Sequence, residues 1–257
     1  MYHLITGLYS EWSRRPKFNV LVLGTSGAGK TALLDKVRAW HTRTSSRALA
    51  RIAPTVGQNV LDLTFKHAIL HFWDLGGEAS LRKIWPQYFE EAEVLVWVMD
   101  ISDWLDEDEI ERSYSKEQDD DDDHERGTAS EQEARAARQE DSWSALASLR
   151  SHSRIRALPL LIVLTKMDHV SSAAASSART RIKGLLADRL AGLEEAEESD
   201  LRDEMENIEG LARPKAGSGT WEDWDVVGCS AKDGTGLATL VDWLNARAQQ
   251  RPRRSNR

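Results

Sequence analysis

Residues 18–31 have the sequence FNVLVLGTSGAGKT, and this stretch decides the fold. Its first six residues form a short, largely apolar run, which is typical of a buried strand. A glycine cluster follows, and the residues from Lys30 to Trp40 then have the composition of a helix. Residues 24–31 match the pattern G-x-x-x-x-G-K-[ST] in full. The stretch therefore predicts a strand, a phosphate-binding loop and a helix.

The loop has a direct chemical use. Its glycines let the backbone wrap closely around a polyphosphate, and the N–H groups at the helix N-terminus face the anion. Lys30 would reach the β- and γ-phosphates, and the Thr31 hydroxyl would bind Mg²⁺. The motif alone does not choose between ATP and GTP, or between a molecular switch, a kinase and a motor.

Other apolar runs predict the rest of the sheet. We expect two strands joined by a turn near Lys66, two strands buried on both faces, a short last strand and an amphipathic C-terminal helix; they cover residues 57–65, 67–73, 93–99, 159–164, 226–229 and 237–248. Strands that alternate with helices imply a three-layer α/β domain with a largely parallel sheet.

Two polar stretches depart from this alternation, near residues 104–130 and 171–220. The first contains five consecutive aspartates, which favours a solvated loop over a weak cation site. The second is Ser/Ala-rich and then acidic, with helical composition over about 180–212. We expect both to be insertions in a domain of residues 17–250, between an amphipathic helix at 1–16 and a basic tail at 251–257.

Composition limits the function classes. The 257 residues carry a formal net charge of −8, which argues against a general nucleic-acid binder. A single cysteine, Cys229, rules out an internal disulfide, and no apolar run is long enough to span a bilayer. We expect a monomer that is cytoplasmic or peripheral on a membrane.

Four further motifs follow in a fixed order. Residues 54–57 (PTVG), 73–78 (WDLGGE), 165–168 (TKMD) and 229–232 (CSAK) resemble the first switch, the second switch, the guanine-specificity motif and the base-capping loop of GTPases. A carboxylate at Asp168 can accept two hydrogen bonds from guanine that adenine cannot offer. Thr165 stands where most relatives carry Asn.

The residues of the two switches, including IWPQYF at 84–89, resemble the ADP-ribosylation factor (Arf) family of small GTPases. The resemblance covers roughly residues 1–100, 143–168 and 224–252. It implies a P-loop NTPase fold with a mostly parallel six-stranded sheet, GTP or GDP as ligand, and Mg²⁺ held by Thr31, Thr55 and Asp74. The residues that it assigns to nucleotide binding are Gly24, Thr25, Ser26, Gly27, Ala28, Gly29, Lys30, Thr31, Ala32, Thr55, Gly77, Thr165, Lys166, Asp168, Cys229, Ser230 and Ala231.

The start of the chain, MYHLITGLY, resembles the Arf-related protein branch, whose members act at the trans-Golgi. Tyr2 excludes N-myristoylation. The resemblance implies that residues 1–12 engage a Golgi membrane or membrane receptor, with docking on the core as the alternative. It also implies that an exchange factor, an activating protein and effectors bind around residues 55–58, Trp73 and Tyr88, with Trp73 and Tyr88 exposed.

The resemblance also implies that hydrolysis depends on Glu78, Gly77 and Lys30. Glu78 stands where the family has its catalytic glutamine, and an ionised glutamate can only accept hydrogen bonds. We therefore expect slow hydrolysis. Three hypotheses remain: a regulatory GTPase in Golgi vesicle traffic, a low-turnover GTP-binding adaptor, and an unrelated P-loop kinase or ATPase.

Overall fold

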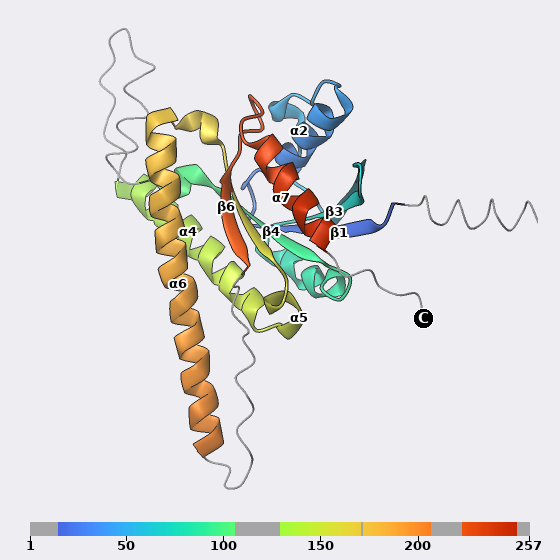
Figure 1. The fold of residues 1–257 in the computed structure, drawn as a ribbon. Coiled ribbons are helices and arrows are strands. Elements are labelled where there is room, and N and C mark those ends of the chain that lie inside the picture. Colours follow the sequence, from blue (N-terminus) through green and yellow to red (C-terminus); the bar gives the residue numbers. More distant parts are fainter. Residues whose placement is uncertain (1–14, 106–128, 171, 207–222, 251–257) are drawn as a thin grey trace, which may run out of the picture.

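A computed structural model describes residues 15–105, 129–170, 172–206 and 223–250 (Figure 1). Its sheet has six strands in the order β2-β3-β1-β4-β5-β6, and only the β2–β3 pair is antiparallel. The strands are β1 (Lys17–Leu23), β2 (Gln58–Thr64), β3 (Ile69–Leu75), β4 (Val94–Asp100), β5 (Leu160–Thr165) and β6 (Trp224–Gly228). The predicted six-stranded, mostly parallel sheet is confirmed.

Helices cover both faces of the sheet (Figure 1). One face carries α2 (Lys30–Thr42) and α7 (Leu237–Gln250), and the other carries α4 (Ala129–Arg150), α5 (Ser153–Arg156) and α6 (Ser172–Glu206). Four 3-10 segments lie in the connections: η1 (Leu49–Arg51), η2 (Ala79–Tyr88), η3 (Ile101–Asp103) and η4 (Met167–His169).

The two faces of the sheet bury two separate apolar clusters. Because successive side chains of a strand point to opposite faces, Val20 and Val22 of β1 join the cluster under α2 and α7. Leu21 and Leu23 join the cluster under α4, α6 and η2. Because β1, β3, β4 and β5 run parallel, their carboxyl ends lie at one edge of the sheet, where ligands of open α/β sheets bind.

The segment after β5 differs from the expected polar insertion. Helix α6 begins at Ser172, about eight residues before the predicted helical stretch, and its first half is a layer of the core. Its buried residues recur every four positions: Ala174, Ala178, Ile182, Leu186 and Leu190. The Ser/Ala-rich composition concealed this spacing, which a search for the helical period would have found.

Several sequence-based expectations fall outside the described residues. These are the N-terminal amphipathic helix, the aspartate run, residues 207–220 and the basic tail. Among the helices that the structure does describe, none is both long enough and apolar enough to cross a membrane.

The burial of α6 predicts how this helix responds to substitution. Leu186→Ala should lower the free energy of unfolding by about 2–5 kcal/mol, because it leaves a cavity in the core. A Cβ on Gly184, two residues away on the opposite and exposed side of the helix, would meet nothing within 4 Å. Gly184→Ala should therefore raise stability by about 0.5–1 kcal/mol through helix propensity. Urea denaturation measures both changes in the free energy of unfolding. If Leu186→Ala and Gly184→Ala changed it equally, the burial of α6 would be contradicted.

Candidate nucleotide-binding site

The phosphate loop lies at the end of β1, packed against the neighbouring strand. A Cβ on Gly24 would come within 2.3 Å of the Val98 carbonyl oxygen, so only glycine fits there. Lys30 is buried, and its Nζ donates to the carbonyls of Gly24 and Thr25, at 2.8 Å each. Burial lowers the pKa of Lys30 to about 8, against the opposing effect of the Asp74 charge. The loop thus places one poorly solvated ammonium where the motif expects phosphate.

The three residues expected to hold a metal ion meet beside this lysine. Thr31 Oγ1 donates to Asp74 Oδ2 at 2.7 Å and lies 2.7 Å from Thr55 Oγ1. Since Thr31 has one hydroxyl hydrogen and gives it to Asp74, Thr55 is the donor in the second bond. The start of α2, the end of β3 and the first switch therefore converge on a single carboxylate.

This set fits a hard divalent cation such as Mg²⁺, which prefers hydroxyl, carboxylate and water oxygens. Asp74 Oδ1 is buried and has no hydrogen-bond partner, so one acceptor remains available for a metal-bound water. Across the described ranges, no cluster of three or more His, Cys, Asp or Glu side chains offers another site. Sequence reasoning missed Asn59, whose Nδ2 lies 3.3 Å from Asp74 Oδ2 and 3.4 Å from Thr55 Oγ1.

The second switch closes over the phosphate loop. A Cβ on Gly77 would lie 2.3 Å from the Gly24 carbonyl oxygen and 2.4 Å from Lys30 Nζ, so this close approach requires glycine. The buried Trp85 indole donates to the Gly76 carbonyl at 3.1 Å. Glu78 is exposed and accepts a 2.9 Å hydrogen bond from the Ser80 hydroxyl. Gly77 thus lies against the phosphate loop, while the Glu78 carboxylate is engaged by Ser80 within the second switch.

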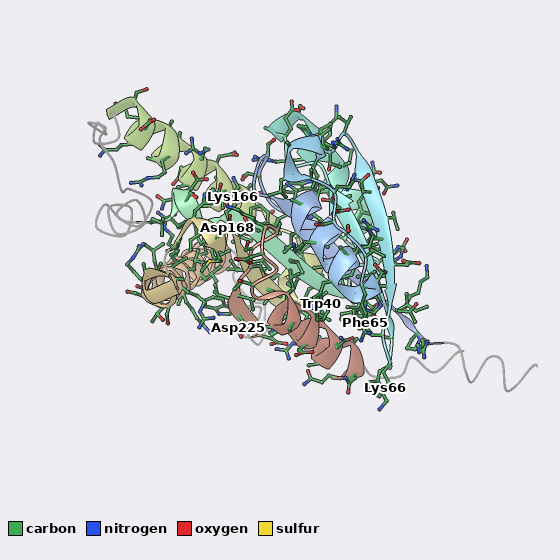
Figure 2. The ribbon with its side chains drawn as sticks, turned by 90° about the horizontal axis from the view of Figure 1, so that it is seen from above. Trp40, Phe65, Lys66, Lys166, Asp168 and Asp225 are labelled. Carbon is green, nitrogen blue, oxygen red and sulfur yellow. The ribbon has the colours of Figure 1, made fainter. Side chains whose placement is uncertain are left out.

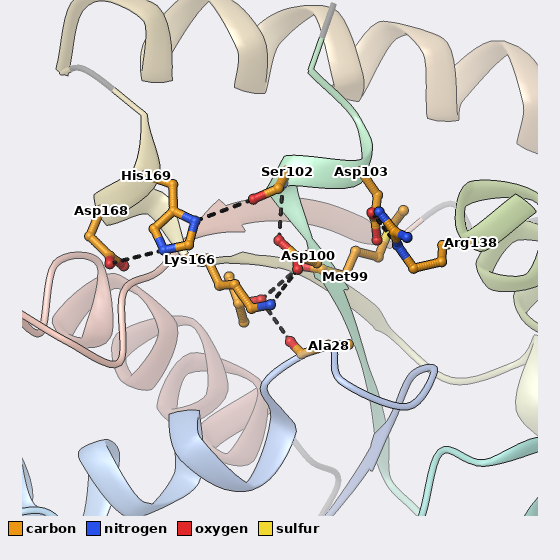
Figure 3. A network of polar contacts seen from close by, with 10 residues as sticks. Ala28, Met99, Asp100, Ser102, Asp103, Arg138, Lys166, Asp168 and His169 are labelled. Carbon is orange, nitrogen blue, oxygen red and sulfur yellow. Dashed lines mark hydrogen bonds and ion pairs between the residues drawn. The ribbon is translucent and has the colours of Figure 1, made fainter. Parts of the chain in front are cut away.

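Thr165 joins the base-recognition loop to the phosphate loop. Its buried hydroxyl donates to the carbonyls of Ala28, at 2.7 Å, and Met99, at 3.0 Å (Figure 3). A hydroxyl has one hydrogen, so these two acceptors share it, whereas the amide of an asparagine could give one hydrogen to each. Thr165 therefore keeps the connection between the loops with half the donors.

Lys166 and Asp168 lie side by side at this edge, well away from the Phe65–Lys66 turn at the far end of the hairpin (Figure 2). Lys166 Nζ pairs with Asp100 at the end of β4, and the Ser230 hydroxyl donates to Asp168 Oδ1 at 2.7 Å. Ser230 also accepts the backbone N–H of Lys232 at 3.1 Å, which orders the loop that contains Ala231. The structure brings the two predicted base motifs together.

The remaining predicted residues line the same loops. Ser26 and Gly27 are exposed at the tip of the phosphate loop, with Gly29 and Ala32 partly buried beside it. Cys229 is fully buried, and burial raises the pKa of its thiol to about 12. This agrees with the expectation that Cys229 is a small buried residue and not a reactive thiol.

The expected exposure of Trp73 is wrong in this structure. Trp73 is 8% exposed, because it packs against the tilted ring of Tyr88, with ring centroids 5.5 Å apart, and in a T-shaped contact with His71. Gln58 is exposed, and its side-chain oxygen accepts a hydrogen bond from the Tyr88 hydroxyl. The exposed Gln58 and the partly buried Tyr88 therefore form the surface here.

Asp35, which the motifs did not single out, holds the chain that leads to Thr55. Its carboxylate is buried in α2 and accepts the Arg47 backbone N–H at 2.7 Å, besides the guanidinium groups of Arg38 and Arg47 at 3.0 Å each. Burial alone would raise the pKa of Asp35, but these bonds hold it below its usual value. No short-range sequence signal pairs positions 35 and 47.

The sheet order, the phosphate loop after β1 and the helices on both faces define the P-loop fold of small GTPases. The structure is similar to the nucleotide-analogue-bound small GTPase Arl6 of Trypanosoma brucei, with a TM-score of 0.52, 19% identity, and coverage of 92% of this chain and 99% of that one. It is also similar to the mammalian SRP receptor structure, with a TM-score of 0.52, 18% identity, and coverage of 89% and 99%.

Residues 4–116 match the model of the ADP-ribosylation factor family. ADP-ribosylation factor-like protein 3 of Saccharomyces cerevisiae is 38% identical over 104 residues, 40% of this chain and 52% of the relative. Human ADP-ribosylation factor-related protein 1 is 34% identical over the same shares. The chain thus spans about half the length of these relatives. Residues 4–116 carry an Arf-family sequence, which confirms the resemblance predicted from the motifs.

The Asp35 contacts predict a pH-dependent stability. Because its folded-state pKa lies below the unfolded value of about 3.9, the stabilisation is present above that pH and is lost as the pH falls through the folded-state pKa. Asp35→Asn should lower the free energy of unfolding by about 1–3 kcal/mol at pH 7 and flatten its acid dependence. Urea denaturation between pH 7 and pH 3 measures both. The exposed Asp188→Asn is the control, and parallel curves for Asp35→Asn and wild type would contradict the role of Asp35.

Proposed function

We propose that this protein is a GTP-binding switch that alternates between GDP and GTP states with Mg²⁺. The observation that carries the proposal is the meeting of Thr31, Thr55 and Asp74 at 2.7 Å beside the buried Lys30. Thr31 belongs to the phosphate loop, Thr55 to the first switch and Asp74 to the second. An ion that they hold would therefore connect these three segments. Bound Mg²⁺ would neutralise phosphate charge.

Switching follows from which of these contacts depend on the γ-phosphate. Thr55 and Gly77 are on loops, and both lie against the phosphate loop in this structure. A γ-phosphate gives each an additional partner, and its loss releases the segments that contain them. The described conformation, with both switches closed, is the one that we assign to the triphosphate state.

Selectivity for guanine rests on Asp168. Its Oδ1 accepts the Ser230 hydroxyl, which holds the carboxylate at the edge where the base would lie. Two carboxylate oxygens match the N1–H and exocyclic amine of guanine, whereas adenine presents an acceptor at N1. This match supports GTP over ATP, and so weighs against the P-loop kinase or ATPase hypothesis.

Asp168→Asn tests the base assignment. The amide offers one donor in place of an acceptor, so GTP binding should weaken by about 1–3 kcal/mol. Binding of xanthosine triphosphate, whose C2 carbonyl can accept from the amide, should strengthen. Competition against a fluorescent nucleotide measures both. Mass spectrometry of nucleotide retained by the purified wild-type protein is the companion measurement, and retained ATP with no guanine nucleotide would contradict the proposal.

We further propose that intrinsic hydrolysis is slow. The Glu78 carboxylate accepts from Ser80 and is exposed, and it has no proton to donate to a γ-phosphate or an attacking water. A low-turnover adaptor is the alternative role. The two roles differ in whether an activating protein accelerates turnover.

Glu78→Gln should raise the single-turnover rate of GTP hydrolysis by about tenfold, a change of about 1.4 kcal/mol in the barrier. The reason is that the amide supplies both a donor and an acceptor to the attacking water. Glu78→Ala is the control and should stay slow. Equal rates for the wild type and Glu78→Gln would reject the explanation.

The cellular role is proposed from the Arf-related resemblance at the N-terminus. We place the protein on trans-Golgi membranes through residues 1–12, where it would control vesicle traffic. Exchange factor, activating protein and effectors would bind around residues 55–58 and Tyr88. The exposed Gln58 makes that surface more polar than the family's usual aromatic one.

A further inference from the structure

The second switch is fixed to α4 by one arginine. Arg82 lies in η2, and its Nε donates to the Gly77 carbonyl at 3.2 Å. The other two nitrogens of its guanidinium donate to the two carboxylate oxygens of Asp141 on α4, at 2.8 and 2.5 Å. The guanidinium therefore bridges Gly77 and α4 with all three of its nitrogens, a geometry that a lysine cannot reproduce.

The peptides on both sides of Gly77 are held by side chains of η2. The Trp85 indole N–H donates to the Gly76 carbonyl, and the Arg82 Nε–H donates to the Gly77 carbonyl. The C=O and N–H of a trans peptide point in opposite directions, so the bond to Trp85 turns the Gly77 N–H away from the core. The bond to Arg82 fixes the next peptide, and with it the backbone of Glu78.

The Trp85 and Arg82 contacts differ in how easily they break. Trp85 is 3% exposed and belongs to the core, while the side chains of Arg82 and Asp141 are 20% and 48% exposed. A cavity of about 230 Å³ adjoins Arg82, with Trp85, Phe89, Ala145 and Leu149 in its lining. The guanidinium therefore has solvent on one side and space on the other, so its bonds can change without disrupting the core.

From this geometry we infer that Arg82, anchored by Asp141, is a positioning residue for the γ-phosphate contact of Gly77. The inference rests on the proposed GTP switch. Arg82 does not touch the phosphate; it acts by holding the Gly77–Glu78 peptide over the phosphate loop. The ion pair therefore favours the triphosphate state and leaves GDP binding unchanged, because GDP has no group for Gly77 to contact.

The test compares a non-hydrolysable GTP analogue with GDP on the full chain. Asp141→Asn should weaken analogue binding by about three- to tenfold, in line with a partly exposed ion pair coupled to a binding site. GDP affinity should stay within about twofold. Arg82→Lys should behave similarly, and the Arg82→Lys/Asp141→Asn double variant should lose no more than the larger single effect, because both remove one interaction. The exposed neighbour Glu140→Gln is the matched control and should behave as wild type.

Each outcome has a distinct meaning. A wild-type ratio of analogue to GDP affinity in Asp141→Asn would overturn the role of the ion pair. Equal weakening of both nucleotides would make Arg82 a merely structural residue and would also overturn it. If the wild type binds neither nucleotide, the proposed function itself fails and this inference fails with it. Thermal unfolding of each variant shows that the affinity changes come from folded protein.

Discussion

The Asp74 carboxylate is the interaction on which the site depends. It stands at the end of β3, buried, and accepts the hydroxyl of Thr31 at the start of α2. Thr55 reaches the same group through Thr31, and Asn59 approaches it from β2. A buried charge is tolerable only when hydrogen bonds or a cation compensate it. The segments that approach Asp74 are the ones whose positions must change if the protein is a switch.

A second set of contacts organises the opposite end of the site. Thr165 shares its single hydroxyl hydrogen between the carbonyls of Ala28 in the phosphate loop and Met99 in β4. Lys166 pairs with Asp100 (Figure 3), and Asp168 accepts a hydrogen bond from the Ser230 hydroxyl. The phosphate loop and the 165–168 segment are thus joined through the backbone carbonyl of Ala28. A substitution at Thr165 would act on both, although its side chain is buried beneath the loops.

Much of the fold follows from local pattern, and the exceptions have a physical cause. The strands buried on both faces were predicted because continuous apolar runs leave few alternatives. The beginning of α6 was not, because Ala174 and Ala178 are small residues in a Ser/Ala-rich stretch and look like part of a linker. Their burial depends on the neighbouring apolar cluster under α4, which no window of sequence contains. Trp73 was expected on the surface, and the ring of Tyr88 covers it.

The sequence by itself determined the chemistry that is available: a phosphate loop, two switch motifs and a guanine motif, in an order that fixes their places at one sheet edge. Each is a short segment whose residues act on the backbone or ligand beside them. Tertiary structure alone decided which distant side chains support these segments. Arg82 and Asp141 are 59 positions apart, and Asp35 and Arg47 are 12 apart. Such pairs form because the packing of helices against the sheet brings their charges together in space. Local sequence does not determine which distant side chains become neighbours.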